Sequence, residues 1–227
     1  TGQPAGKQFM SAQLTFRQLY QLLDEHVQPG TWWPADTDFE IGVGAILTQN
    51  TAWINVEQAI AALKRTDQLS PEGIARVDVD ELRGLIRPAG FMNAKATYLK
   101  NFATWFLTNH ETAHLVETST LRIDLLEVKG VGPETADDML LYTYDRPVFI
   151  WDTYARRMLA TAGYVLPKGY EPTRRALSSC VRDADFSVDE LQRFHGLIVE
   201  AGKHATAAGG WDTYWQHLQQ AAKPSEG

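Results

Sequence analysis

The sequence predicts an all-α fold, and two observations support this prediction. Apolar residues recur along most of the chain at the three- and four-residue spacing of amphipathic helices, and no segment shows the apolar–polar alternation of a half-buried strand. Proline, glycine and hydroxyl residues separate these segments at the places where helices usually begin or end. With 227 residues, the chain can bury a sizeable core, either as one domain or as two small lobes.

The first half of the chain is expected to be a series of helices. Residues 16–27 form an amphipathic segment that Pro29 and Gly30 end. Residues 39–47 are apolar on almost every side, which fits a buried strand or a buried helix. The helical neighbours favour a central helix, in which glycines permit close packing. Further helices are expected over residues 53–63, 79–86 and 91–107, and another begins at residues 70–73.

A glycine-rich hairpin is expected between two helices in the second half. The segment runs Lys129-Gly130-Val131-Gly132-Pro133, between helical residues 121–128 and 136–143. Glycine adopts positive φ readily, and proline suits the first position of a helix. Amides at such a turn can bind an anion such as phosphate, although a simple helix–helix turn is an equally direct interpretation. Later helices are expected over residues 154–159, 172–181, 188–202 and 211–222.

Composition limits the class of protein. The formal net charge of −7 argues against a general polyanion binder, so that DNA binding requires local basic positions. The candidates are Lys95, Lys100, Lys129, Arg146, Arg156, Arg157 and Lys203. The single Cys180 excludes an internal disulfide and a four-cysteine metal site, and it suggests a reducing compartment such as the cytoplasm. No apolar run approaches the length of a membrane span, and no signal-peptide pattern is present.

The order of motifs around the hairpin resembles that of a known family. Hairpin, helix, proline loop and apolar run are followed by Asp152-Thr153, which resembles the helix-hairpin-helix DNA glycosylases of the endonuclease III superfamily. The resemblance covers about residues 32–203. It implies two helical lobes with a DNA-binding cleft between them. Residues 35–146 would form the central lobe, residues 10–34 and 147–227 the terminal lobe, and residues 1–9 a loose N-terminal segment.

The resemblance also implies roles for single residues. Asp152 would be the catalytic carboxylate that stabilises positive charge on the sugar, although an Asp before a helix can simply be its N-cap. Trp32, Trp33, Pro34 and Trp53 would form the base pocket around an extruded cationic base, and core packing is the alternative for the tryptophans.

Other matches imply DNA contacts. Gln49 would fill the gap left by the extruded base, and Phe91 would wedge into the opposite strand; a helix cap and a core residue are the respective alternatives. Phosphate contacts are implied for Lys95, Lys129, Gly130, Val131, Gly132 and Thr135, with a solvated charge as the alternative for Lys95. Backbone carbonyls of Leu126, Val128 and Val131 would hold a monovalent cation.

Two departures from the family pattern narrow the expectation. Glu134 stands eighteen residues before Asp152, where bifunctional glycosylase/lyases carry the lysine that forms a Schiff base. The C-terminal cysteine cluster is absent, so no iron–sulfur cluster is expected. His195 and Lys203 lack zinc-ligand spacing and are read as structural or phosphate-facing.

With these two departures and the segment Trp32-Trp33-Pro34, the sequence resembles the monofunctional 3-methyladenine glycosylases of the endonuclease III type. The expectation is a monomeric DNA N-glycosylase that excises alkylated purines from double-stranded DNA without cutting the strand. It would need no cofactor beyond the cation at the hairpin. The alternatives are a glycosylase for another damaged or mismatched base and a catalytically silent DNA-binding module.

Overall fold

The computed structural model describes residues 13–30 and 33–223, and within these ranges it contains twelve α-helices, one 3-10 helix and no strand. The first half holds α1 (Phe16–His26), α2 (Asp38–Leu47), α3 (Trp53–Arg65), α4 (Pro71–Arg76), α5 (Val79–Ile86), the 3-10 helix η1 (Arg87–Ala89) and α6 (Met92–Ala113). The second half holds α7 (Thr118–Glu127), α8 (Pro133–Tyr142), α9 (Thr153–Thr161), α10 (Tyr170–Ala184), α11 (Val188–Ala207) and α12 (Trp211–Ala221). The predicted all-α fold class is confirmed.

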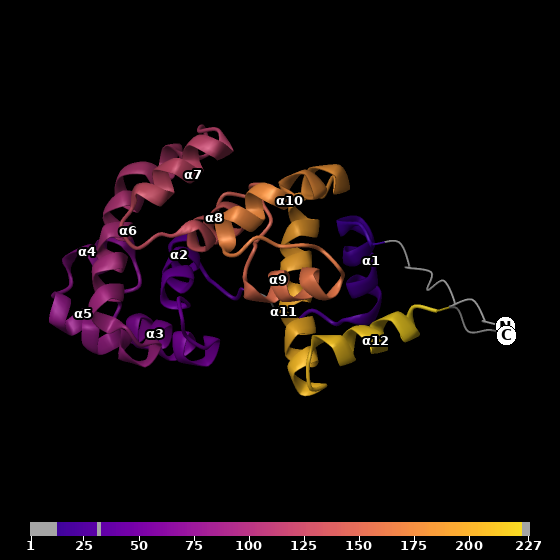
Figure 1. Cartoon of the computed structure of the whole chain (residues 1–227). Coiled ribbons are helices and arrows are strands. Elements are labelled where there is room, and N and C mark those ends of the chain that lie inside the picture. The colour runs from indigo at the N-terminus through magenta and orange to yellow at the C-terminus, as the bar shows by residue number, and fades with distance from the viewer. Residues whose placement is uncertain (1–12, 31–32, 224–227) are drawn as a thin grey trace, which may run out of the picture.

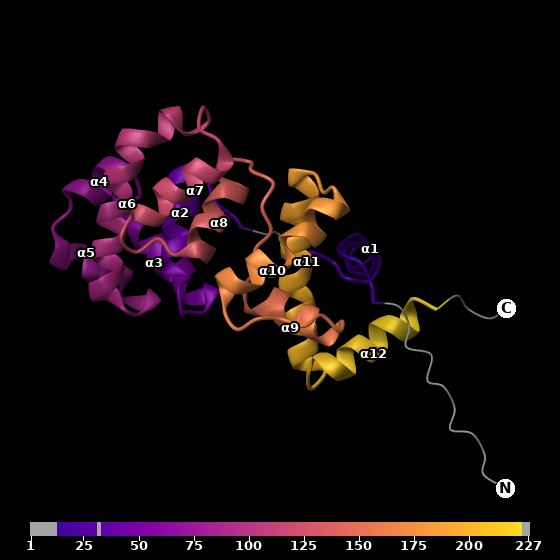
Figure 2. The same cartoon turned by 45° about the horizontal axis from the view of Figure 1, so that its top comes forward.

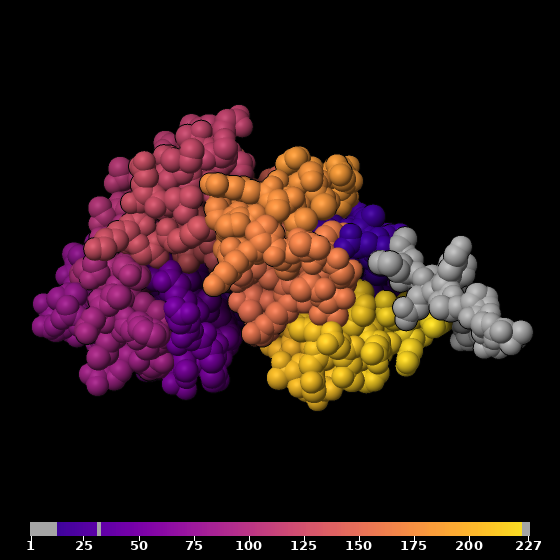
Figure 3. All heavy atoms as spheres, viewed as in Figure 1, coloured from indigo at the N-terminus to yellow at the C-terminus, as the bar shows by residue number. Residues whose placement is uncertain are grey.

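The helices gather into two lobes (Figures 1 and 2). Helices α2 to α8 form one lobe, and α1 packs with α9 to α12 in the other. The chain therefore starts in the second lobe, crosses to the first and returns. In the space-filling view, the surface is hollowed between the violet residues of the first lobe and the orange and yellow residues of the second (Figure 3).

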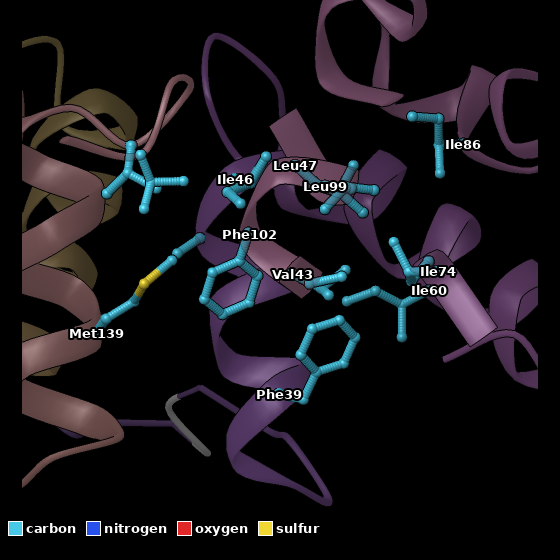
Figure 4. Packing of buried hydrophobic residues seen from close by; sticks show 14 of the residues in the cluster. Phe39, Val43, Ile46, Leu47, Ile60, Ile74, Ile86, Leu99, Phe102 and Met139 are labelled. Atoms are coloured by element: carbon cyan, nitrogen blue, oxygen red, sulfur yellow. The ribbon is translucent and has the colours of Figure 1, made fainter. Parts of the chain in front are cut away.

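Helix α2 lies at the centre of the first core. The Thr37 hydroxyl accepts a hydrogen bond from the Glu40 amide at 3.1 Å and so caps the helix. Val43 and its apolar neighbours are fully buried (Figure 4). A Cβ atom at Gly42 would lie 2.2 Å from Cζ of Phe102 on α6, so the missing side chain lets the two helices approach. The expectation of a buried central helix is confirmed.

The second core is rich in aromatic rings. Phe149 and Trp151 lie with ring centroids 4.5 Å apart in the extended segment before α9, and Phe16 of α1 contacts both. Trp151 is almost fully buried. Because this ring is anchored among neighbours from α1 and α11, the residue that follows it, Asp152, enters α9 from a fixed position.

The two cores meet within α8. Buried side chains up to Leu140 belong to the first core, whereas Leu141 belongs to the second. The expected domain boundary near residue 146 stays a prediction, but the change of packing partner occurs inside a helix rather than in the loop after it. A rigid element therefore spans the junction between the lobes.

A partly buried ionic network also joins the lobes. Arg122 of α7 donates to Asp137 of α8 at 2.7 Å and to Glu171 of α10 at 3.0 Å. Tyr170 donates its hydroxyl proton to Asp137 at 2.8 Å. Burial alone would raise the pKa of Glu171, but hydrogen bonds from Arg174 and Arg122 lower it to about 2. These contacts fix α10 against the hairpin helix.

Within the described residues, no helix combines the length and the apolar character needed to cross a bilayer.

Gly42→Ala should destabilise the protein by about 1–3 kcal/mol, because the new methyl group would overlap the Phe102 ring in a closely packed core. Gly84→Ala is the matched control: Gly84 is exposed in α5 with nothing within 4 Å of its missing Cβ. It should gain about 0.5–1 kcal/mol from helix propensity. Urea unfolding of both variants measures the difference, and equal shifts of one sign would contradict this packing account.

Candidate active site

The hairpin between α7 and α8 spans residues 128–132. Gly130 has φ of +106°, and a Cβ there would lie 2.2 Å from Cγ of Tyr98, so that only glycine fits. Gly132 has nothing within 4 Å of its missing Cβ. The amides of Gly130 and Gly132 donate to no acceptor among the described residues. The turn therefore presents two amide donors at the start of a helix, as an anion site requires.

Two residues predicted to bind phosphate instead build the hairpin. The Val131 amide donates to the Val128 carbonyl at 2.9 Å. The Thr135 side chain is buried, and its hydroxyl accepts a hydrogen bond from Nε2 of Gln49 at 3.1 Å. The same Gln49 nitrogen donates to the Gly130 carbonyl at 2.8 Å. These positions do not support phosphate contacts by Val131 or Thr135, and they give Gln49 a role in holding the turn.

The prediction of a phosphate contact for Lys95 is wrong. Its side chain is 2% exposed, and Nζ donates to the carbonyls of Leu47 and Ala89 at 2.8 Å each. These carbonyls lie at the ends of α2 and η1, where a cation is favoured. Burial lowers the pKa of Lys95.

Six other basic residues were candidates for DNA contacts, among them Lys100, Lys129 and Arg146. Lys100 donates to the Ile74 carbonyl at 3.0 Å and Arg146 to the Ala113 carbonyl at 3.2 Å, so both are engaged within the protein. Lys129 is exposed on the hairpin. Of the two lysines predicted to bind phosphate, Lys129 is the one that the structure leaves accessible.

Phe91 precedes α6 with φ of +47°, a left-handed conformation that is uncommon for a bulky residue. Its side chain is 67% exposed. An exposed aromatic ring on a strained backbone is not a core residue, so that alternative is excluded. Insertion of Phe91 into DNA stays a prediction that this geometry permits.

A cavity of about 420 Å³ lies between the lobes and has an aromatic wall. Its lining includes Trp33, Pro34, Trp53, Glu134, Asp138, Asp152, Tyr154, His195 and Lys203. The rings of Trp33 and Trp53 contact each other directly, with centroids 5.8 Å apart and planes inclined by 54°. A base cannot lie between these two rings, so within the predicted base pocket they form one aromatic wall. Trp32 lies outside the described residues.

Asp152 reaches this cavity from the N-terminus of α9. It is 7% exposed, and Oδ1 accepts a hydrogen bond from the Ala155 amide at 2.7 Å. This is the N-cap arrangement, and the same carboxylate also lines the cavity. The two interpretations of Asp152, helix cap and site carboxylate, are therefore compatible in one geometry.

A histidine stands behind this carboxylate. His195 of α11 is 6% exposed, and its Nε2 lies 3.3 Å from Oδ2 of Asp152. The hydroxyl of Tyr142 lies 2.6 Å from Nδ1 of the same ring. Of the two interpretations given for His195, structural or phosphate-facing, its burial against Asp152 favours the structural one. Nothing in the sequence indicated that His195 would contact Asp152, because the two residues are 43 positions apart.

Two further carboxyls crowd the site. The pKa of Glu134 is raised to about 7, first because the walls of the cleft displace water from around its carboxyl and then because Asp152 lies nearby. Part of the Glu134 side chain is nevertheless exposed to solvent. The pKa of Asp138 is raised well above its usual value, first by burial and then by the charges of Glu134 and Asp152. Asp138 is 3% exposed. Sequence reasoning missed Asp138, whose only available signal was its place one turn after Glu134.

Among the described residues, no group of three or more His, Cys, Asp or Glu side chains is arranged to hold a metal ion. A cation at the carbonyls of Leu126, Val128 and Val131 stays a prediction. The Val128 carbonyl already accepts the Val131 amide, which leaves one of its two lone pairs for an ion.

Comparison with known proteins identifies relatives of the whole arrangement. Residues 43–183 match the family described as HhH-GPD superfamily base excision DNA repair protein. A protein of Methanocaldococcus jannaschii, provisionally named a DNA repair glycosylase, is 41% identical over 188 residues, which are 80% of this chain and 84% of the relative. Endonuclease III of Sulfolobus acidocaldarius is 28% identical over 162 residues, 71% of this chain and 70% of the relative.

Solved structures give the same picture. The 3-methyladenine DNA glycosylase of H. pylori, bound to 1,N6-ethenoadenine, matches with a TM-score of 0.69 and 27% identity, over 84% of this chain and 98% of that chain. A trapped endonuclease III–DNA covalent intermediate matches with a TM-score of 0.67 and 18% identity, over 85% of this chain and 88% of that chain. The second likeness concerns the fold alone.

Asp138→Asn should stabilise the protein more at pH 8 than at pH 5. Burial raises the pKa of Asp138 well above its usual value in the folded protein, whereas in the unfolded chain the carboxyl ionises above about pH 4. Between these two pKa values, wild-type stability falls as pH rises, and an amide of the same shape does not share this loss. Melting temperatures of both proteins at the two pH values measure the effect. A difference that is independent of pH would contradict it.

Proposed function

The chain belongs to the HhH-GPD superfamily of base excision DNA repair proteins, and we propose that it is a DNA N-glycosylase that removes alkylated purines, 3-methyladenine in particular, from double-stranded DNA. The observation that carries this proposal is the position of Asp152. Its carboxylate is fixed at a helix N-terminus and lines an aromatic cavity next to the hairpin.

Hydrolysis of an N-glycosidic bond places positive charge on the sugar as the base departs. A carboxylate held beside the sugar stabilises that charge without reorganising during the reaction. Water adds to C1′ as the bond to the base breaks, and its proton passes to a carboxylate such as Asp152. A 3-methylated adenine is cationic and leaves as a neutral base, so this site needs no strong acid for the leaving group.

The cavity supports an extruded base as its occupant. Trp53 and the part of Trp33 that lines the cavity can contact a flat ring, and an aromatic face attracts a cationic ring more than a neutral one. The H. pylori 3-methyladenine glycosylase, which was solved with a modified adenine, is 27% identical to this chain. This likeness supports an alkylated purine over other lesions.

The hairpin supplies the contact to the DNA backbone in this proposal. Two outward amides at Gly130 and Gly132, with the exposed Lys129 beside them, suit a phosphate and read no sequence. Such contacts suit a protein of negative net charge, because attraction is confined to one edge of the cleft.

The protein should release free 3-methyladenine from methylated duplex DNA. Chromatography of the released base measures this reaction. Asp152→Asn should lower the single-turnover rate by a factor of about a hundred or more, since the charge that stabilises the sugar cation is lost. Binding to the methylated duplex should persist. Release by this variant at the wild-type rate would remove Asp152 from the chemistry.

Glu134 stands in place of the lyase lysine, so we expect an abasic product with an intact strand. Lys203 is the lysine that also lines the cavity, and its ammonium pairs with Glu200 at 2.7 Å. Borohydride added during turnover should trap no protein–DNA adduct. An adduct that disappears in Lys203→Met would instead assign that amine as a nucleophile and make the enzyme bifunctional.

A further inference from the structure

The carboxylate of Asp152 is held at both of its oxygens. The Ala155 amide donates to Oδ1 at 2.7 Å, and Nε2 of His195 lies 3.3 Å from Oδ2. The second distance is long for a hydrogen bond, and such contacts commonly shorten when the reacting complex forms. The amide alone would leave the carboxylate free to turn about its Cβ–Cγ bond, whereas two contacts define its plane.

The contacts of the imidazole determine where its proton lies. Oδ2 of an ionised Asp152 can only accept, so Nε2 of His195 must carry hydrogen. In the neutral ring, Nδ1 then accepts. The Tyr142 hydroxyl lies 2.6 Å from Nδ1 and 3.4 Å from the Gln192 carbonyl, so its one proton goes to the nearer acceptor, Nδ1. Tyr142 is the last residue of α8, the helix that starts at the hairpin.

We propose that His195 is a positioning residue that orients the Asp152 carboxylate, and that Tyr142 fixes the imidazole tautomer which this requires. The proposal rests on the proposed function, since it takes Asp152 as the catalytic carboxylate. It extends that function by assigning two residues from α8 and α11 to the organisation of the reaction.

The series of contacts from Asp152 through His195 to Tyr142 continues to the wall of the cavity. The ring of Tyr142 stacks on Trp33, with centroids 5.1 Å apart and planes inclined by 21°. Trp33 lines the cavity and contacts Trp53. A base that rests on Trp33 therefore bears on the ring whose hydroxyl holds His195. Occupancy of the cavity and orientation of the carboxylate share one set of packed side chains.

A pair of substitutions separates positioning from a purely structural role. The amide nitrogen of a glutamine reaches about as far as Nε2 of histidine, whereas that of an asparagine reaches only about as far as Nδ1. His195→Gln can therefore still donate to Asp152, and His195→Asn cannot. Both remove the ring from a buried site, so both should lose similar thermal stability. His217→Asn, at an exposed position of α12, is the control for histidine loss elsewhere.

Single-turnover release of 3-methyladenine, measured over a range of enzyme concentrations, reads out the difference. His195→Asn should lower the maximal rate by about ten- to a hundredfold, as expected for loss of a hydrogen bond to a charged group. The half-saturating concentration should change little, because binding is not affected. His195→Gln should recover most of the rate. Equal maximal rates for the two variants would overturn the proposal.

Tyr142→Phe isolates the second part, because it keeps the ring on Trp33 and removes only the hydroxyl. The maximal rate should fall by about two- to tenfold, the range for one neutral hydrogen bond. An unchanged rate would show that the Tyr142 hydroxyl does not help to orient His195.

Nitrogen NMR of the free protein tests the hydrogen bonds of His195 without an activity assay. The signals of His195 are identified by their loss in His195→Gln, and they should show the proton on Nε2 in the wild type and a mixture of tautomers in Tyr142→Phe. A wild-type proton on Nδ1 would overturn the proposal. If wild type releases no base while the spectrum shows Nε2–H, the proposed function fails and the hydrogen-bond chain stands.

Discussion

The rest of the structure depends on the constraint that one helix, α8, serves both lobes at once. Its first turn follows the hairpin, and its apolar residues divide between the two cores around Leu140 and Leu141. Glu134, Asp138 and Tyr142 recur at intervals of four and so share the face toward Asp152 and His195. Asp137 points instead to the Arg122 network. A shift of this helix would therefore move the hairpin, the cavity and the interlobe contact together.

The electrostatics of the site follow from this crowding. Burial and the charges of neighbouring carboxyls raise the pKa values of Glu134 and Asp138, whereas the carboxylate of Asp152 accepts a hydrogen bond from a helix amide. The cavity therefore combines the fixed carboxylate of Asp152 with two carboxyls of raised pKa, Glu134 and Asp138. This arrangement suits a reaction in which positive charge develops on the substrate. The same arrangement costs stability, as is common where function and packing compete.

Local rules were enough to predict the helices, the hairpin and the cap at Asp152, because each depends on residues adjacent in sequence. The resemblance to a family supplied the cavity and its tryptophans. Neither source predicted that Lys95 is buried, since the two helix ends that its ammonium joins meet only in the folded chain. The contact of His195 with Asp152 was not predicted for the same reason: the carboxylate lies on another element. The direct contact of Trp33 with Trp53 also depends on tertiary packing, which motif spacing does not encode.

In the proposed reaction, the cavity receives an extruded base while Asp152 faces its sugar. A crystal structure of the Asp152→Asn variant with a duplex that contains an uncleavable 3-methyladenine analogue tests it most directly. We expect the analogue in the cavity lined by Trp33 and Trp53, with C1′ about 3–3.5 Å from the substituted carboxamide. The hairpin amides of Gly130 and Gly132 should meet a phosphate of the same strand. An analogue that remains stacked in the duplex, or a sugar out of reach of position 152, would contradict the account.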